Sequence, residues 1–146
     1  MTKIFTIGFT KKGAATFFGL LRQPGLRRLV DARLNNVSQL TGFTKRDDLK
    51  YFLETINGIQ YSHLPELAPT AAILSEYKNS GGDWSRYERN FLALMEERGV
   101  ERVLTPEFMD GVCLLCSEVS PAYCHRRLVA EYLQSYWDGV EIQHLI

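Results

Sequence analysis

The chain has 146 residues, of which 45% are hydrophobic and 12% aromatic, as expected for a protein with a sizeable buried core. Its 17 basic and 17 acidic side chains cancel, which argues against nonspecific binding to duplex nucleic acid, although a local basic cleft is compatible with this balance. The apolar run after the first residues is only about six residues long, too short for a signal peptide or a membrane span. We therefore expect a cytoplasmic protein that does not associate with membranes.

Apolar strands and amphipathic helices alternate along the chain. Apolar or alternating runs predict strands at residues 3–8, 28–31, 59–64, 112–116 and 140–145. Between them, helical spacing of apolar residues predicts a helix before residue 24, further helices at 44–56, 70–77 and 84–98, and a last helix at 122–137. Thr44 and Ser85 look like helix caps, and residues 105–111 look like a loop or short turn.

Alternation of this kind implies right-handed crossovers and a mainly parallel sheet. We expect an α/β fold in which residues 1–146 form a single domain, a three-layer sandwich with about five strands and helices on both faces. The strand ends at 8–10, 31–33 and 116–118 would then open on one edge of the sheet. Open α/β sheets bind their ligands at that edge.

The last predicted helix starts at this edge with a Cys-His-Arg motif. Ser120 fits the N-cap and Pro121 the first helical position, so Cys124 would lie near the fourth position of the helix. There the helix dipole and Arg126 would favour a thiolate, whereas the alternative is a half-buried, unreactive cysteine. Adjacent helical positions splay by about 100°, so Cys124 and His125 should not both face one ligand. His125 is either catalytic or a hydrogen-bonded link to the sheet.

The three cysteines are an odd number, which suits reduced thiols rather than a disulfide framework. Cys113 and Cys116 lie three positions apart on a predicted strand and should face opposite sides, so they cannot share a metal ion. A zinc site from Cys116, Cys124 and His125 lacks an obvious fourth ligand and a standard spacing. We therefore expect no metal and no cofactor.

Charged residues at the predicted edge suggest an anion site. Arg33 and Arg126, with free N–H groups at the helix start, could bind phosphate or carboxylate; alternatively they form structural ion pairs with Asp31 or Glu118. The predicted catalytic residues are Cys124, Glu118 and His125, with Glu118 as a general base. The predicted substrate-binding residues are Gly8, Thr10, Asp31, Arg33, Cys116 and Arg126.

Three functions fit this pattern. The first is an enzyme acting on a phosphate-bearing or nucleotide-like substrate, with the arginines holding the anion and Cys124 or Glu118 doing the chemistry. The second is a non-catalytic nucleotide or nucleic-acid binding module that uses the same arginines. The third is a thiol redox sensor through Cys116 and Cys124, which requires Cα atoms within about 7 Å of each other.

Two parts of the chain resemble a known family. Residues 114–118, then Pro121 and residues 124–126, resemble the carboxyl-terminal signature of the family catalogued as domain of unknown function 488 (DUF488). Residues 6–8 and 29–33 are similar to that family's first two strand ends. The resemblance implies an α/β domain with its shared polar residues on one side of the sheet.

The chain departs from the family pattern after the first strand. Phe9 and Thr10 stand where the family often has histidine and serine. Without a histidine at the first strand end, the resemblance shifts any catalytic role toward Cys124, His125 and Glu118.

Overall fold

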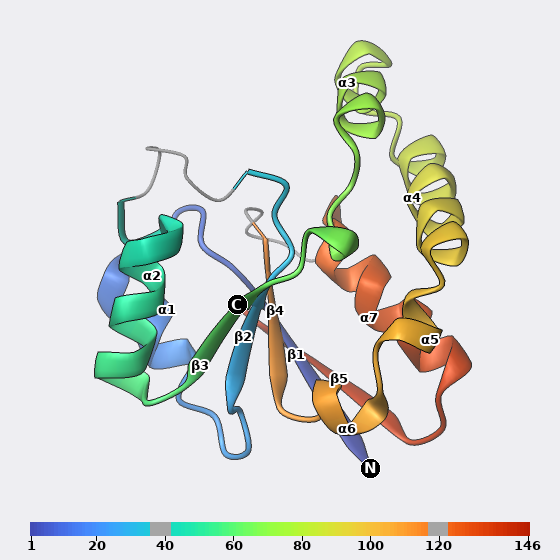
Figure 1. The fold of residues 1–146 in the computed structure, drawn as a ribbon. Helices are drawn as coiled ribbons and strands as arrows, with labels where there is room; N and C mark the ends of the chain where they lie inside the picture. The colour runs from blue at the N-terminus through green and yellow to red at the C-terminus, as the bar shows by residue number, and fades with distance from the viewer. Residues whose placement is uncertain (36–41, 117–122) are drawn as a thin grey trace.

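The computed structural model describes residues 1–35, 42–116 and 123–146. These residues form a three-layer α/β sandwich, with helices on both faces of a central sheet (Figure 1). Three residues singled out in the sequence lie outside the described residues: Glu118, the predicted general base, and Ser120 and Pro121, the predicted start of the last helix.

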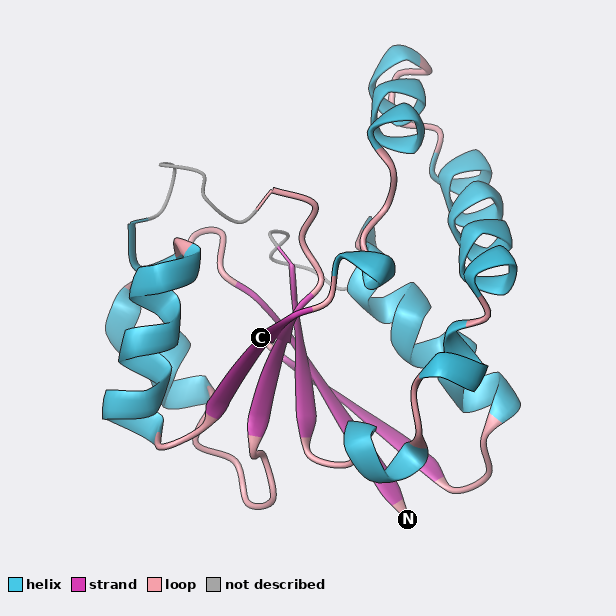
Figure 2. Cartoon of the chain, viewed as in Figure 1, coloured by secondary structure: helices cyan, strands magenta, loops and turns pink. Residues whose placement is uncertain are grey.

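The described residues contain one parallel sheet, which confirms the predicted fold class. Its order is β3-β2-β4-β1-β5, and each neighbouring pair is parallel (Figure 2). All five residues of the fourth strand are buried, which explains its unbroken apolar sequence, because a central parallel strand is covered on both faces. The strands are β1 (Thr2–Gly8), β2 (Arg28–Asp31), β3 (Gln60–His63), β4 (Val112–Cys116) and β5 (Val140–Leu145).

Helices cover both faces of the sheet. One face carries α1 (Ala14–Leu20), η1 (Gly42–Thr44), α2 (Arg46–Phe52) and its π-helical continuation η2 (Leu53–Asn57). The other side carries η3 (Pro65–Leu67), α3 (Ala71–Asn79), α4 (Trp84–Arg98), α5 (Val100–Val103), α6 (Pro106–Met109) and α7 (His125–Tyr136). Among the helices of the described residues, none is long and apolar enough to cross a membrane.

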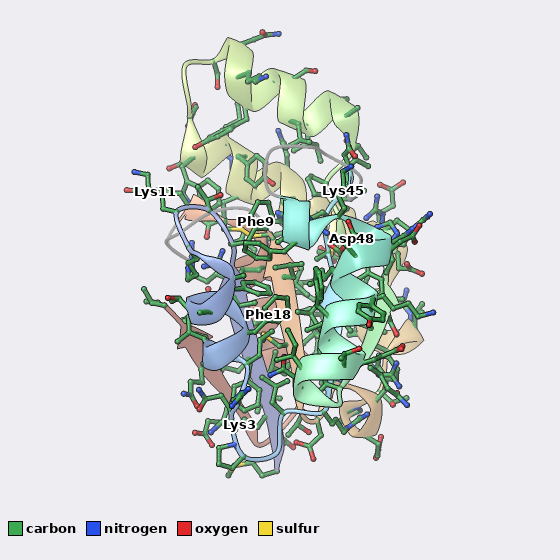
Figure 3. All side chains as sticks on the ribbon, turned by 90° about the vertical axis from the view of Figure 1, so that its left-hand side faces the viewer. Lys3, Phe9, Lys11, Phe18, Lys45 and Asp48 are labelled. Atoms are coloured by element: carbon green, nitrogen blue, oxygen red, sulfur yellow. A yellow bond between two sulfur atoms is a disulfide. The ribbon has the colours of Figure 1, made fainter. Side chains whose placement is uncertain are left out.

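Alternate residues of the strands belong to two separate hydrophobic cores, one on each face of the sheet. Phe5 and Ile7 of β1 pack toward α1 and α2, where Phe18 lies between the two helices (Figure 3). Ile4 of the same strand packs on the other side with Phe91 of α4. The two-residue period of a strand thus supplies apolar side chains to both faces at once.

Several predicted helix ends differ from the structure. Lys45, not Thr44, is the N-cap of α2. Asp83, not Ser85, is the N-cap of α4, and its carboxylate accepts a hydrogen bond from the N–H of Arg86. Residues 105–111, predicted as a loop or turn, contain α6, which Thr105 caps. A side chain caps a helix only if the backbone leaves the helix there, which depends on the path of the preceding segment.

The turn before β4 requires glycine at position 111, and this requirement can be tested. Gly111 has φ +83, its N–H donates to the Lys3 carbonyl, and a Cβ there would collide with the Gly25 carbonyl oxygen. Gly58 also has a positive φ (+66) but has open space around it. We expect both alanine variants to lose about 1–2 kcal/mol of unfolding free energy from left-handed strain, and Gly111→Ala to lose at least about 1 kcal/mol more from the clash. Urea denaturation measures both, and equal losses would contradict the packing constraint.

Candidate functional site

Two central strands end side by side where their connections diverge. Gly8 of β1 is paired in register with Cys116 of β4. The chain after β1 leads to α1 on one face, whereas the chain after β4 leads to α7 on the other. Such a divergence opens a crevice at the carboxyl ends of the strands, which is where open parallel sheets hold their ligands.

A cleft of about 620 Å³ lies at this edge. On the side of the sheet it is lined by Arg33 and by three residues that we call the cysteine cluster, Cys116, Cys124 and His125. The rest of its lining includes an aromatic wall, defined as Tyr77, Trp84, Tyr87 and Tyr123. Within this wall Trp84 stacks on Tyr87 with ring centroids 4.9 Å apart and meets Tyr123 edge-on at 5.6 Å.

The structure joins Cys116 and Cys124 by a disulfide, with Cα atoms 7.4 Å apart. This differs from the expected reduced thiols, and the Cα separation is slightly larger than the limit of about 7 Å set for a redox pair. The two residues meet because one ends β4 and the other precedes α7. Cys113 is a free, buried thiol in the core under α1 and α2, so it faces away from Cys116, as the strand geometry predicts.

The last helix starts later than predicted, and this changes the geometry of the motif. Helix α7 begins at His125, and Cys124 is its N-cap, with extended backbone angles of φ −138 and ψ 141. The helical splay expected between Cys124 and His125 therefore does not apply. Both residues line the cleft, contrary to the expectation that only one could face a ligand.

Arg126 lies completely buried behind the cysteine cluster. Its Nη1 donates to the Cys116 sulfur at 3.1 Å, and its Nε donates to the Thr6 hydroxyl at 3.4 Å. The Thr6 oxygen is in turn 2.6 Å from Nδ1 of His144. A buried guanidinium beside a sulfur favours the thiolate when the cysteine is reduced. Because Arg126 has no exposed surface, it acts through Cys116 rather than by touching a ligand in the open cleft.

Three residues of this edge were missed by the sequence reasoning. His144 lies at the end of the chain without a motif around it, but it is part-buried, and burial together with the Arg126 charge lowers its pKa. Thr6 left a weak signal as a polar residue within an apolar strand. Lys12 gave no signal in the sequence. Its ammonium group is buried and has no hydrogen-bond partner in the part of the chain that the structure describes. Burial and the charge of Arg126 lower its pKa.

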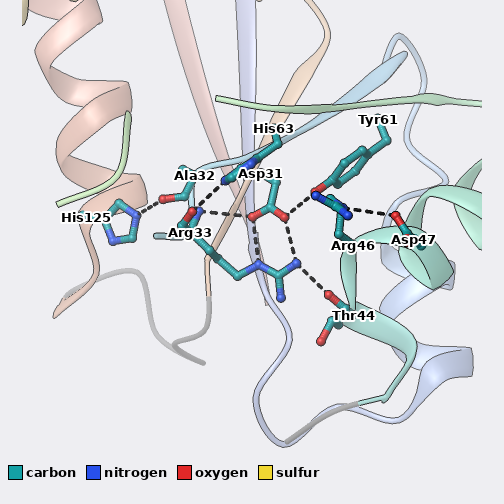
Figure 4. A network of polar contacts seen from close by, with 9 residues as sticks. All are labelled: Asp31, Ala32, Arg33, Thr44, Arg46, Asp47, Tyr61, His63 and His125. Carbon is teal, nitrogen blue, oxygen red and sulfur yellow. Dashed lines mark hydrogen bonds and ion pairs between the residues drawn. The ribbon is translucent and has the colours of Figure 1, made fainter. Parts of the chain in front are cut away.

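Arg33 is occupied by a structural ion pair (Figure 4). Its Nε and Nη2 bind the two carboxylate oxygens of Asp31, each at 2.8 Å, and Nη2 also donates to the Thr44 carbonyl at 2.6 Å. The Tyr61 hydroxyl donates to the same carboxylate at 2.6 Å, and the carboxylate is fully buried. This bidentate pair corresponds to the structural alternative weighed for Arg33, and it leaves little of the guanidinium for a ligand.

His125 links α7 to the end of β2. Its Nε2 lies 2.7 Å from the Ala32 carbonyl oxygen, which can only accept, so Nε2 carries the proton (Figure 4). Loss of hydration on burial lowers the pKa of His125 to about 4. The imidazole is therefore neutral at pH 7, and Nδ1 keeps its lone pair.

The predicted site residues thus separate into two groups. Arg33, Cys116, Cys124 and His125 line one cleft. The other predicted residues among the described part of the chain are absent from that lining, although they lie at the same edge: Gly8, Thr10, Asp31 and Arg126.

The Asp31 network generates a stability prediction. Asp31→Ala leaves the Arg33 guanidinium buried without its counterion, so we expect the unfolding free energy to fall by about 3–5 kcal/mol. Tyr61→Phe removes one hydrogen bond to the carboxylate and should cost about 1.5–3 kcal/mol. Urea denaturation tests both variants. A smaller loss for Asp31→Ala than for Tyr61→Phe would show that the Arg33 charge is balanced elsewhere.

The lowered pKa of His125 generates a pH prediction. Since the folded protein holds this histidine neutral down to about pH 4, against an ordinary value of 6.5, the unfolded chain takes up the proton first as the pH falls. The contribution of the neutral, buried His125 to the free energy of unfolding is complete above pH 6.5. It is lost as the pH falls to 4, by up to about 3 kcal/mol.

His125→Gln should remove most of this dependence in urea denaturation series between pH 7 and pH 4. His144→Gln is the matched control, because the pKa of that histidine is lowered in the same direction but less strongly. The prediction is wrong if His125→Gln loses stability with falling pH as steeply as the unmodified protein.

One family model matches residues 13–133, which include β2 to β4, the cysteine cluster and most of α7. It carries the description "Domain of unknown function DUF488". No curated protein and no solved structure was found to match the chain. Since the family match covers most of the sequence and agrees with the resemblance seen in its motifs, the chain belongs to the DUF488 family.

Proposed function

We propose that this protein is an enzyme that acts on a nucleotide-like substrate held in the cleft, and that the chemistry takes place at the cysteine cluster once its disulfide is reduced. The observation that carries the proposal is the composition of the cleft, in which the aromatic wall and the cysteine cluster share one cavity. A concave, largely apolar pocket that holds a few chemically reactive groups is the usual form of an enzyme site.

The aromatic wall supports a ligand with a planar ring. Trp84 and Tyr87 already stack on each other, and Tyr123 is 64% exposed beside them. Exposed aromatic rings are the usual stacking surfaces for nucleobases. The cleft volume of about 620 Å³ lies within the range of small-molecule sites.

The charge at this edge supports an anionic ligand. Lys78 lines the cleft, and Lys12 lies close enough to the buried Arg126 for the two charges to interact. Arg33, which the sequence suggested as an anion holder together with Arg126, is instead paired with the Asp31 carboxylate. A phosphate-bearing ligand would instead meet the ammonium group of Lys78 and the positive potential of the buried Arg126.

The chemistry requires thiolates. In the disulfide neither sulfur is a good nucleophile or ligand, whereas reduction supplies two electrons and two protons from a thiol reductant and releases both side chains. Cys116 then has the guanidinium of Arg126 beside it, and Cys124, as the N-cap of α7, lies at the positive end of the helix dipole. His125 is a neutral imidazole next to both.

The binding half of the proposal is tested with a matched pair of tyrosines. Tyr123 lines the cleft and is 64% exposed, and Tyr51 of α2 is 63% exposed on the opposite face. We expect calorimetric titration of the reduced protein with a panel of nucleoside monophosphates and triphosphates to find at least one that binds. Tyr123→Ala should weaken that binding about fivefold or more, and Tyr51→Ala should leave it unchanged.

The catalytic half is tested by following the bound nucleotides over time with liquid chromatography and mass spectrometry. Turnover should require a reductant, stop after peroxide treatment, and be lost in Cys116→Ser. Binding without any turnover would make the chain a binding module instead. A complete lack of nucleotide binding would refute the substrate class.

A further inference from the structure

We propose that the reduced cysteine cluster binds a zinc ion, with Cys116, Cys124 and His125 as its three protein ligands. The metal site stands on the geometry of these residues, and its part in catalysis rests on the proposed function. The sequence argued against zinc because adjacent helical positions at Cys124 and His125 would splay apart, and because a fourth ligand and a standard ligand spacing were missing. The structure removes the first objection, since Cys124 precedes the helix.

The ligand atoms are already gathered. One ring nitrogen of His125 and the two sulfurs lie within 4.8 Å of one another. A tetrahedral zinc ion with bonds of about 2.0–2.3 Å needs its ligand atoms less than about 4 Å apart, so small side-chain rotations suffice. The Cα atoms of the cysteines are 7.4 Å apart, beyond the range of about 4.4–6.8 Å that disulfides usually span, so the backbone leaves room for the two sulfurs to separate around an ion.

The residues around the cluster support metal binding. The Nε2–H of His125 donates to the Ala32 carbonyl at 2.7 Å, which orients the ring and leaves Nδ1 as the donor atom. Zinc-bound histidines almost always have such a partner on the second ring nitrogen. Arg126 Nη1 donates to the Cys116 sulfur in the same supporting role.

The missing fourth ligand defines the kind of zinc site. A structural zinc has four protein ligands, whereas a catalytic zinc has three and leaves one position for water or substrate; two cysteines and one histidine are a known catalytic set. Here that position would face the cleft, since all three ligands line it. Two thiolates balance the charge of the ion, their protons are released on binding, and Arg126 adds a positive charge that favours an anionic oxygen at the open position.

Reduction of the disulfide must precede metal binding, because the two sulfurs are bonded to each other in the oxidised form. A thiol reductant transfers two electrons and two protons to the Cys116–Cys124 disulfide and becomes a disulfide itself. A peroxide accepts two electrons from the two thiolates and is reduced to water with two protons from the solvent, while the disulfide re-forms and the zinc ion is released. The cluster therefore alternates between a zinc-loaded form and an oxidised, metal-free form.

Cobalt(II) is the spectroscopic probe for this site. The purified full chain is reduced with a phosphine under anaerobic conditions, desalted and titrated with cobalt chloride. We expect one ion per chain, with the sulfur-to-cobalt charge-transfer absorption and the intense visible bands of tetrahedral thiolate coordination. Zinc chloride should then displace the cobalt and bleach both signals, because zinc prefers such a site.

Variants identify the ligands. Cys116→Ser and Cys124→Ser should each lose charge-transfer intensity, and Cys113→Ala is the control that keeps the full spectrum, because Cys113 lies in the opposite core. His125→Gln retains an N–H donor for Ala32 but removes the ring lone pair, so cobalt affinity should fall by at least about 100-fold. Circular dichroism of each variant confirms that it folds.

The outcomes separate this inference from the proposed function. A reduced protein that exposes its thiols to a thiol reagent but shows no sulfur–cobalt band overturns the metal site. Nucleotide turnover that persists after chelation also overturns its catalytic role and makes a cysteine thiolate the nucleophile. Cobalt and zinc binding without nucleotide turnover supports the metal site and refutes the proposed function instead.

Discussion

The burial of one guanidinium underlies the architecture of the site. Arg126 is the largest side chain that is fully buried in the described residues, and it stands at the start of α7 against the ends of β1 and β4. A buried charge is tolerated only if hydrogen-bond acceptors surround it, so Thr6 and Cys116 must be held in place. The helix start, the two strand ends and the cysteine sulfur are therefore fixed relative to one another.

Two buried arginines at the same edge are compensated in different ways. Arg33 has a permanent counterion in the Asp31 carboxylate, which makes it part of the scaffold. Arg126 donates to a sulfur whose charge depends on its chemical state, neutral in the disulfide and negative in the thiolate. The guanidinium beside Cys116 thus favours the reduced, ionised form of this cysteine.

The two arginines lie in different halves of this edge, one formed by β2 and β3 and the other by β4 and α7. The network of Asp31, Arg33, Tyr61 and His63 ties β2 and β3 together and shapes one end of the cleft. The cysteine cluster lies on the side of β4 and α7. His125 connects the two halves, because its Nε2–H donates to the Ala32 carbonyl and this bond orients the imidazole.

The sequence alone determined the fold class and most element positions. The bounds predicted for β2, β4 and β5 agree with the structure, because a buried or alternating strand leaves its period directly in the order of residues. It also indicated that the ends of β1, β2 and β4 lie at one edge, since parallel strands joined by crossovers have no other arrangement. Only the tertiary structure decided that Arg33 pairs with Asp31 and that Cys124 lies before the helix. It also decided that His144 lies beside Thr6 and that Lys12 lies near Arg126. The contacts of His144 and Lys12 join segments that are far apart in the chain, and local spacing carries no information about such distances. Arg33 and Asp31 are close in sequence, but their pairing is completed by Thr44 and Tyr61 from other segments.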